Sequence, residues 1–133
     1  MEAVLLYDAH CGFCRWCVAK ALGWDRRGRL RPVALQDPAA DELLAGLDED
    51  ERMGSWHLVD RDGRRYSGGA AFAPLLRLLP RGGRLARLAE EFPRVVEAGC
   101  SAVAGRRSWL GRLIPAAAKR RADAVIGWRA RGQ

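Results

Sequence analysis

The fold of this chain is decided near its start, in the stretch Ala3-Val4-Leu5-Leu6-Tyr7-Asp8-Ala9-His10-Cys11-Gly12-Phe13-Cys14. The first five of these residues form a short, unbroken apolar run, which is typical of a strand buried on both faces of a sheet. The two cysteines follow after a polar turn, and they open a segment whose apolar residues recur at helical spacing. A strand that leads into Cys-x-x-Cys at the start of a helix is typical of a dithiol redox site.

The segment after Cys11 is predicted to be an amphipathic helix, because its apolar residues recur three and four positions apart. The first N–H groups of a helix lack partners within it, and the helix dipole places partial positive charge there. Both effects stabilise a thiolate. We therefore expect Cys11 to be the accessible nucleophile, with a lowered pKa. Cys14, on the apolar face, is expected to be the more buried resolving thiol, with the higher pKa.

The alternation of strand-like and helix-like segments predicts an α/β fold. Strands are expected at residues 3–7, 30–35, 55–59 and 64–67, and Asp62-Gly63 between the last two is typical of a tight hairpin turn. The acidic run 48–51 is expected to be a loop. A parallel first pair joined by a crossover helix, followed by a hairpin, gives a mixed four-stranded sheet covered by helices, in a thioredoxin-like topology.

Further helices are predicted after the hairpin. The first, over 70–79, is expected to turn Phe72, Leu75, Leu76 and Leu79 inward. Helical spacing continues over 85–92 and again after Pro93.

Charge divides the chain into two parts. Residues 1–104 carry equal numbers of basic and acidic residues, so the whole formal charge of +7 belongs to residues 105–133. We predict a thioredoxin-like redox domain over 1–104 and a basic C-terminal helical extension over 105–133, packed on the domain or trailing from it. Binding of nucleic acid or a membrane surface through 105–133 is an alternative that no motif favours.

Two further cysteines are open to more than one interpretation. Cys17 lies on the apolar face of the predicted helix, so we expect a small buried residue there. The alternative is a metal or cluster ligand set of Cys11, Cys14 and Cys17, although the fourth ligand of an iron–sulfur run is missing. A zinc site would need a distant ligand as well, and the candidates are Cys100, His57 and His10. The helical spacing of Cys100 favours a place in the core instead. We expect no metal and no cofactor.

Residues near the motif are candidates for supporting roles. Asp8 is either a turn residue or a proton acceptor near Cys14. A protonated His10 would favour the Cys11 thiolate. His57, on a predicted strand, is expected to be a satisfied packing residue.

Composition indicates the compartment. The 133 residues suffice for one core, and 49% of them are apolar. No basic start precedes the first apolar run, and no stretch approaches the roughly 20 apolar residues of a membrane-spanning helix. Four cysteines without an export signal are more typical of reactive thiols than of a disulfide framework. We therefore expect a cytoplasmic protein.

The segment 7–14 resembles the D-G-x-C-x-x-C signature of the DCC family of predicted thiol–disulfide oxidoreductases. Asp8, Cys11 and Cys14 match the signature, and Ala9 replaces its usual glycine. Leu35-Gln36 and the run 62–71 are also similar, so the likeness covers roughly residues 4–107. The resemblance implies a thioredoxin-like fold and dithiol–disulfide exchange.

This activity predicts that the Cys11 thiolate attacks a disulfide and that Cys14 resolves the mixed disulfide. The expected partners are a protein or small molecule with a disulfide or thiol, and a reductant dithiol. Thioredoxins proper carry a cis-proline before the third strand. Here Met53-Gly54-Ser55 stands at that place, and Ser55 is a candidate to face the sulfurs instead.

Overall fold

The structure, a computed structural model, describes residues 3–131. It contains one four-stranded sheet in the order β2-β1-β3-β4. The strands are β1 (Ala3–Tyr7), β2 (Leu30–Ala34), β3 (His57–Asp60) and β4 (Arg65–Ser67). β1 is parallel to β2 and antiparallel to β3, and β3 and β4 form an antiparallel hairpin. The predicted mixed, thioredoxin-like sheet is therefore confirmed.

Strand β2 lies at the edge of the sheet, where a proline is tolerated. Pro32 has no backbone N–H to donate to a neighbouring strand, and it pairs with Leu5 of β1 on its inner side only. The third strand begins later than expected, at His57, because Ser55 is the C-cap of the helix before it.

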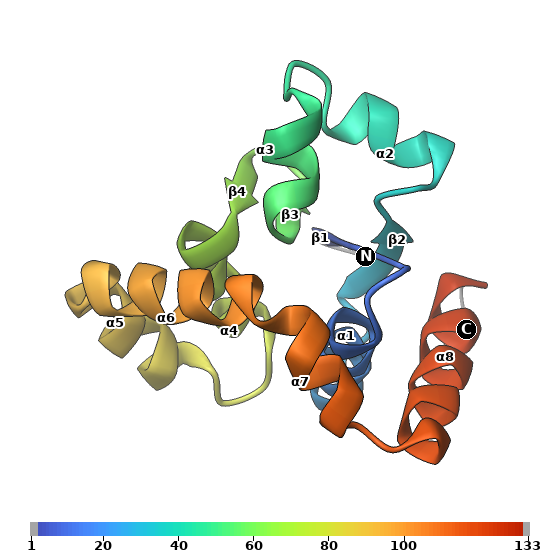
Figure 1. Ribbon diagram of the computed structural model, residues 1–133. Helices are drawn as coiled ribbons and strands as arrows, with labels where there is room; N and C mark the ends of the chain where they lie inside the picture. Colours follow the sequence, from blue (N-terminus) through green and yellow to red (C-terminus); the bar gives the residue numbers. More distant parts are fainter. Residues whose placement is uncertain (1–2, 132–133) are drawn as a thin grey trace.

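Eight α-helices and one short 3₁₀ helix surround the sheet in residues 3–131 (Figure 1). They are α1 (Gly12–Trp24), α2 (Pro38–Leu43), α3 (Glu49–Gly54), η1 (Gly68–Ala71), α4 (Phe72–Leu78), α5 (Gly83–Glu91), α6 (Pro93–Gly105), α7 (Arg107–Leu113) and α8 (Ala116–Ala130). Within the described residues, no helix combines the length and apolar character needed to cross a membrane.

The core is split between the two faces of the sheet. Because successive strand residues point to opposite faces, Leu5 and Leu6 enter different clusters. The cluster with Leu5 includes Leu22 of α1 and Ile126 of α8, whereas the cluster with Leu6 includes Ala40 of α2. β1 is thus covered on both faces, as its unbroken apolar run predicts.

The acidic run 48–51 is part of a helix, so the predicted loop is wrong. Asp48 is the N-cap of α3, and its side chain accepts a hydrogen bond from the backbone N–H of Glu51. Three acidic residues in the first turn complement the positive end of the helix dipole. The negative charge that suggested a solvated loop instead stabilises the start of a short helix.

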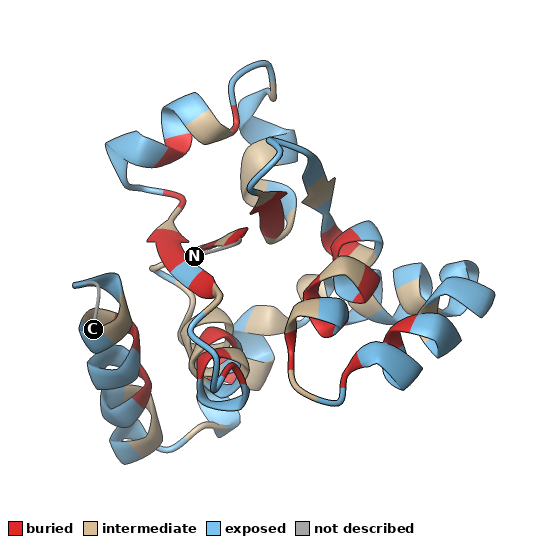
Figure 2. Cartoon of the chain, turned by 180° about the vertical axis from the view of Figure 1, so that it is seen from behind, coloured by how far each residue is buried: buried red, intermediate tan, exposed pale blue. Residues whose placement is uncertain are grey.

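Helices α5 and α6 are largely exposed, as Figure 2 shows. In α5, Ala86 is fully buried whereas Leu88 is 53% exposed. In α4, Phe72 is 39% exposed rather than inward, and Ala73 is buried instead. Leu75, Leu76 and Leu79 are buried, as the sequence predicts, so the inner face of α4 combines Ala73 with leucines. In α5 the buried residue is the small Ala86, and large apolar side chains such as Leu85 and Leu88 lie outside.

The two C-terminal helices lie against α1 (Figure 1). α8 runs beside α1, and Ala122 and Ile126 are its buried residues. Gly111 of α7 lies against the first turn of α1, and a Cβ there would be in van der Waals contact with the backbone nitrogen of Phe13, at 3.4 Å. α7 thus packs directly beside the segment that carries the two cysteines.

Candidate active site

The two cysteines of the motif occupy the start of α1. Cys11 is the N-cap, with extended backbone, and Cys14 lies in the first turn. The Cys11 sulfur accepts a hydrogen bond from the backbone N–H of Cys14 at 3.2 Å. A sulfur therefore takes the place that a serine or aspartate oxygen usually has at a helix start, and it satisfies an N–H without a helical partner.

The two thiols interact with one another. The pKa of Cys14 is raised to about 12, first by burial, then by the hydrogen bond of its side chain to Cys11 and by the charge of Cys11. Both sulfurs are partly buried, and all four cysteines of the chain are free thiols. In the reduced protein Cys14 is therefore protonated at neutral pH, and its thiol donates a hydrogen bond to Cys11.

Asp8 organises the turn between β1 and α1. Its Oδ1 accepts hydrogen bonds from the backbone N–H of His10 at 2.9 Å and from Nε2 of Gln36 at 2.8 Å. Gln36 returns a second bond, because its Oε1 accepts the N–H of Ala9 at 3.1 Å. The carboxylate lies close enough to the thiols to add to the raised pKa of Cys14.

Gln36 was missed as a site residue by the sequence analysis, although a signal for it exists. It follows β2, and Asp8 follows β1. Because β1 and β2 are parallel, residues after their carboxyl ends meet at the same edge of the sheet.

Arg107 joins the site from α7. Its Nη2 lies 3.6 Å from Oδ2 of Asp8 and donates to the carbonyl of Met53 at 3.3 Å. The positive charge of Arg107 opposes the other influences on Cys14 by lowering its pKa. No local sequence pattern identifies this residue, because the contact joins segments almost a hundred residues apart.

The other expected supporting residues lie differently. The His10 side chain is exposed. The hydroxyl of Ser55 donates to the carbonyl of Trp56 at 3.3 Å, and no hydrogen bond joins it to a thiol within residues 3–131. Phe13 and Trp16 stack on one another beside the motif, with ring centroids 6.2 Å apart.

Cys17 and Cys100 are not core residues, so that expectation is wrong. Cys17 is exposed, because it lies at the border of the apolar face whose centre is formed by Val18 and Leu22. Although exposed, Cys17 has a pKa raised to about 11 by desolvation and by Cys11. Cys100 is partly buried, on a helix without any buried residue.

The alternative of a metal or cluster site at Cys11, Cys14 and Cys17 finds no support in the arrangement of the described side chains. Among the described residues, no three histidine, cysteine or acidic side chains gather so that they could hold a metal ion. His57 is one of the few candidate ligands, and both of its ring nitrogens are engaged in hydrogen bonds with Ser67 and Arg52. It is the satisfied packing residue that the sequence predicts.

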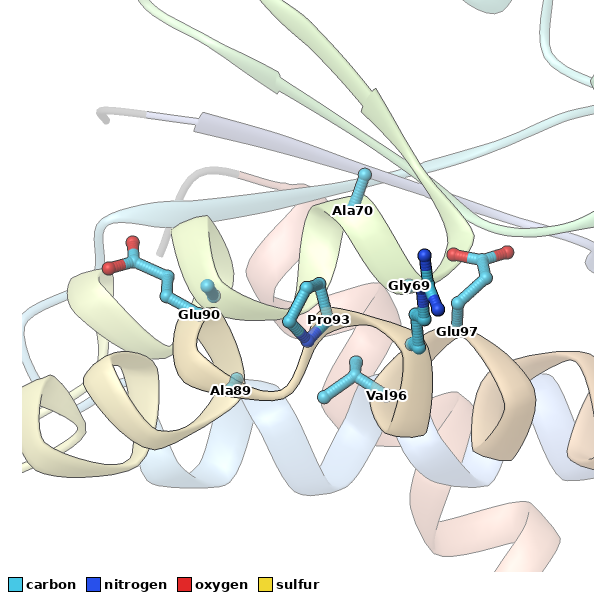
Figure 3. Close-up of a pocket in the computed structure, with 9 residues that line it drawn as sticks. Gly69, Ala70, Ala89, Glu90, Pro93, Val96 and Glu97 are labelled. Atoms are coloured by element: carbon cyan, nitrogen blue, oxygen red, sulfur yellow. The ribbon is translucent and has the colours of Figure 1, made fainter.

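A surface pocket of about 440 Å³ lies elsewhere, between η1, α4, α5 and α6 (Figure 3). Gly69, Pro93 and Glu97 are among its lining residues, and no cysteine lines it. The pocket therefore does not include the thiol site, and none of its lining side chains is a thiol nucleophile.

An open mixed sheet with a Cys-x-x-Cys pair at the start of its first helix defines a thioredoxin-like protein with a dithiol site. Residues 5–113 match the DCC1-like thiol-disulfide oxidoreductase family, and the chain belongs to this family. The resemblance of the sequence motif is thereby confirmed. The match includes α7 with Arg107, and it ends before α8. No curated protein and no solved structure matches the chain.

Proposed function

We propose that Cys11 and Cys14 carry out dithiol–disulfide exchange. The Cys11 thiolate attacks one sulfur of a substrate disulfide, which forms a mixed disulfide and releases the other sulfur as a thiolate. Cys14 then loses its proton to solvent and attacks the Cys11 sulfur, which releases the second thiolate. Two electrons pass from the protein dithiol to the substrate, and a separate reductant dithiol restores the protein.

The observation that carries this proposal is the contact between the two thiols. Two of the influences that raise the pKa of Cys14 to about 12 come from Cys11, as a hydrogen-bond partner and as a charge. Both are lost once the Cys11 sulfur is bound in a mixed disulfide. The pKa of Cys14 then falls, although burial still raises it, so the resolving thiolate forms more readily after the first step than before it.

Asp8 and Arg107 are proposed as positioning residues around this pair. A supporting role of His10 and Ser55 is also proposed, although no hydrogen bond joins either side chain to a thiol in residues 3–131. Asp8 and Arg107 have opposite influences on the pKa of Cys14, smaller than those of burial and Cys11, so they adjust how readily it ionises. The basic residues of the C-terminal segment are partly engaged in such internal contacts, which leaves the dithiol reaction as the function that the geometry supports best.

The test is a thiol count before and after mild oxidation of the reduced protein. The wild type should lose two of its four free thiols, and peptide mapping should locate the new bridge between Cys11 and Cys14. Cys11→Ser and Cys14→Ser should not form an intramolecular bridge, whereas Cys17→Ser should behave as the wild type. A wild-type protein that forms no Cys11–Cys14 bridge would refute the proposal.

A further inference from the structure

Lys119 of α8 reaches into the Cys-x-x-Cys motif. A Cβ placed on Gly12 would lie 2.9 Å from Cε of Lys119 and 3.3 Å from its Nζ. The lysine side chain therefore crosses the position that a side chain at residue 12, the residue directly after Cys11, would fill. Glycine at this position allows a lysine from the far end of the chain to lie directly on the motif.

The charge of Lys119 is unmatched in the described residues, whereas Arg15 and Arg107, two other cations close to the start of α1, are each paired with a carboxylate. Within residues 3–131 no carboxylate lies at ion-pair distance from Lys119. By contrast, Arg107 is paired with Asp8 at 3.6 Å and Arg15 with Asp123 at 3.1 Å. The ammonium group beside Gly12 is thus available to an anion that arrives from solvent.

The stability of α8 does not explain this lysine. Lys119 lies near the start of α8, where the helix dipole disfavours positive charge. The first turn has no acidic residue and no side-chain cap to offset it. Only two of the 23 basic residues of the chain are lysines, and the other one, Lys20, lies over the ring of Trp16 on the same helix as the cysteines.

We propose that Lys119 selects small disulfides that carry a carboxylate a few bonds from the sulfur. This inference rests on the proposed function of Cys11 and Cys14. The ammonium would bind the carboxylate while the Cys11 thiolate attacks the adjacent sulfur, which forms the mixed disulfide and releases a carboxylate-bearing thiolate. Small substrates are favoured because α7 and α8 already cover part of the first turn of α1, through Gly111 at Phe13 and Lys119 at Gly12, which leaves less of its surface for an extended protein chain.

The experiment measures how fast the reduced full-length protein reacts with three small disulfides that differ in charge. They are 3,3′-dithiodipropionate, 2-hydroxyethyl disulfide and cystamine, which carry two negative charges, none and two positive charges. Single-turnover rates are measured by acid quench, alkylation and intact mass. Dividing the wild-type rate by the variant rate for each disulfide cancels differences in intrinsic reactivity.

Lys119→Met keeps the aliphatic stem and removes the charge. It should slow the reaction with dithiodipropionate about fivefold, as expected for one charge contact at the surface. The rate with hydroxyethyl disulfide should stay within about twofold, and the rate with cystamine should rise. Lys20→Met is the matched control, because it changes the net charge equally and should leave all three ratios near one.

Other outcomes would overturn the inference. Equal slowing with all three disulfides would show that Lys119 acts on the thiols rather than on the substrate, and unchanged rates would show no role. A wild-type protein that reacts with none of the three disulfides would refute the dithiol function itself.

The salt dependence of the wild-type rates is a second measurement, which needs no variant. Added salt should slow dithiodipropionate and speed cystamine, and the absence of this opposite response would also overturn the inference.

Discussion

Nη1 of Arg129 donates to Oδ2 of Asp25 at 2.7 Å, which joins the last helix to the C-cap of the first. The Asp25 side chain is fully buried, and it also accepts the backbone N–H groups of Arg29 and Leu30. Nη2 of Arg129 donates to the carbonyls of Leu22 and Asp25, at the end of α1. One guanidinium thus satisfies a buried carboxylate and carbonyls that α1 leaves without helical partners.

Arg129→Met is therefore expected to lower the free energy of unfolding by about 3 kcal/mol, because it leaves a buried carboxylate without its countercharge. Urea unfolding followed by tryptophan fluorescence measures this. Arg121→Met, an exposed change on the same helix, should stay within about 0.5 kcal/mol of the wild type. A loss at Arg129 no larger than at Arg121 would mean that the pair does not hold α8 to the body.

His57 makes stability depend on pH. Its Nε2 lies 2.8 Å from the Arg52 carbonyl, so this nitrogen carries the proton, and Nδ1 accepts from the Ser67 hydroxyl at 2.6 Å. Burial lowers the pKa of His57 below 6.5, so the folded protein holds it neutral where the unfolded chain binds a proton. Stability from this source is complete above pH 6.5 and is lost as the pH falls below it.

The measurement is urea unfolding at pH 7.5 and 5.5. The free energy of unfolding should fall on acidification in the wild type, with a slope of at most about 1.4 kcal/mol per pH unit from one group. His10→Gln, which removes the exposed histidine, should keep this slope, whereas His57→Gln should flatten it. If the pH slope of the free energy of unfolding disappeared in His10→Gln and not in His57→Gln, His57 would not be its source.

Local sequence was enough to predict the part of the fold that carries the motif. β1 and the start of α1 follow from an apolar run and a cysteine pair at a strand end. Pro32 is compatible with an edge strand but also with a place near the strand start, and the structure shows β2 at the edge. The spacing of Asp48 and Glu51, three residues apart, also fits the pattern of a helix N-cap and so favours α3, whereas the concentration of charge in the run favours a loop.

Other features could not be derived from local patterns. Helical spacing identifies α5, but periodicity does not tell which face turns inward, and the structure buries Ala86 rather than Leu88. The same limit applies to the site. Gln36 follows from the pairing of two parallel strands, whereas Arg107 and Lys119 reach the cysteines through the packing of α7 and α8 on α1. Such contacts depend on the whole fold.

The four cysteines should differ in reactivity. The pKa is raised to about 12 for Cys14 and to about 11 for Cys17, and burial also raises it for Cys100. Each unit lowers the thiolate fraction at a given pH tenfold, so we expect iodoacetamide at pH 8 to label Cys11 first. Peptide mass mapping after brief alkylation checks the order. Faster labelling of Cys17, the one cysteine residue that is exposed, would show that exposure outweighs ionisation.

Asp8 and Arg107 should shift the resolving step in opposite directions. Arg107 lowers the pKa of Cys14 and Asp8 raises it, so Arg107→Met should raise this pKa further and Asp8→Asn should lower it. Ellman's reagent releases one coloured thiolate when Cys11 attacks and a second when Cys14 resolves. Near pH 8 we expect the second phase to slow about fivefold in Arg107→Met and to quicken in Asp8→Asn.

The pH profile of the second phase separates this effect from a loss of structure. Its midpoint should move to higher pH in Arg107→Met and to lower pH in Asp8→Asn, whereas Arg112→Met, an exposed change on the same helix, should leave it in place. Because the two groups lie 3.6 Å apart, the double variant should differ from the sum of the single changes. Midpoints that move in the same direction in both variants would mean that the charges do not govern Cys14.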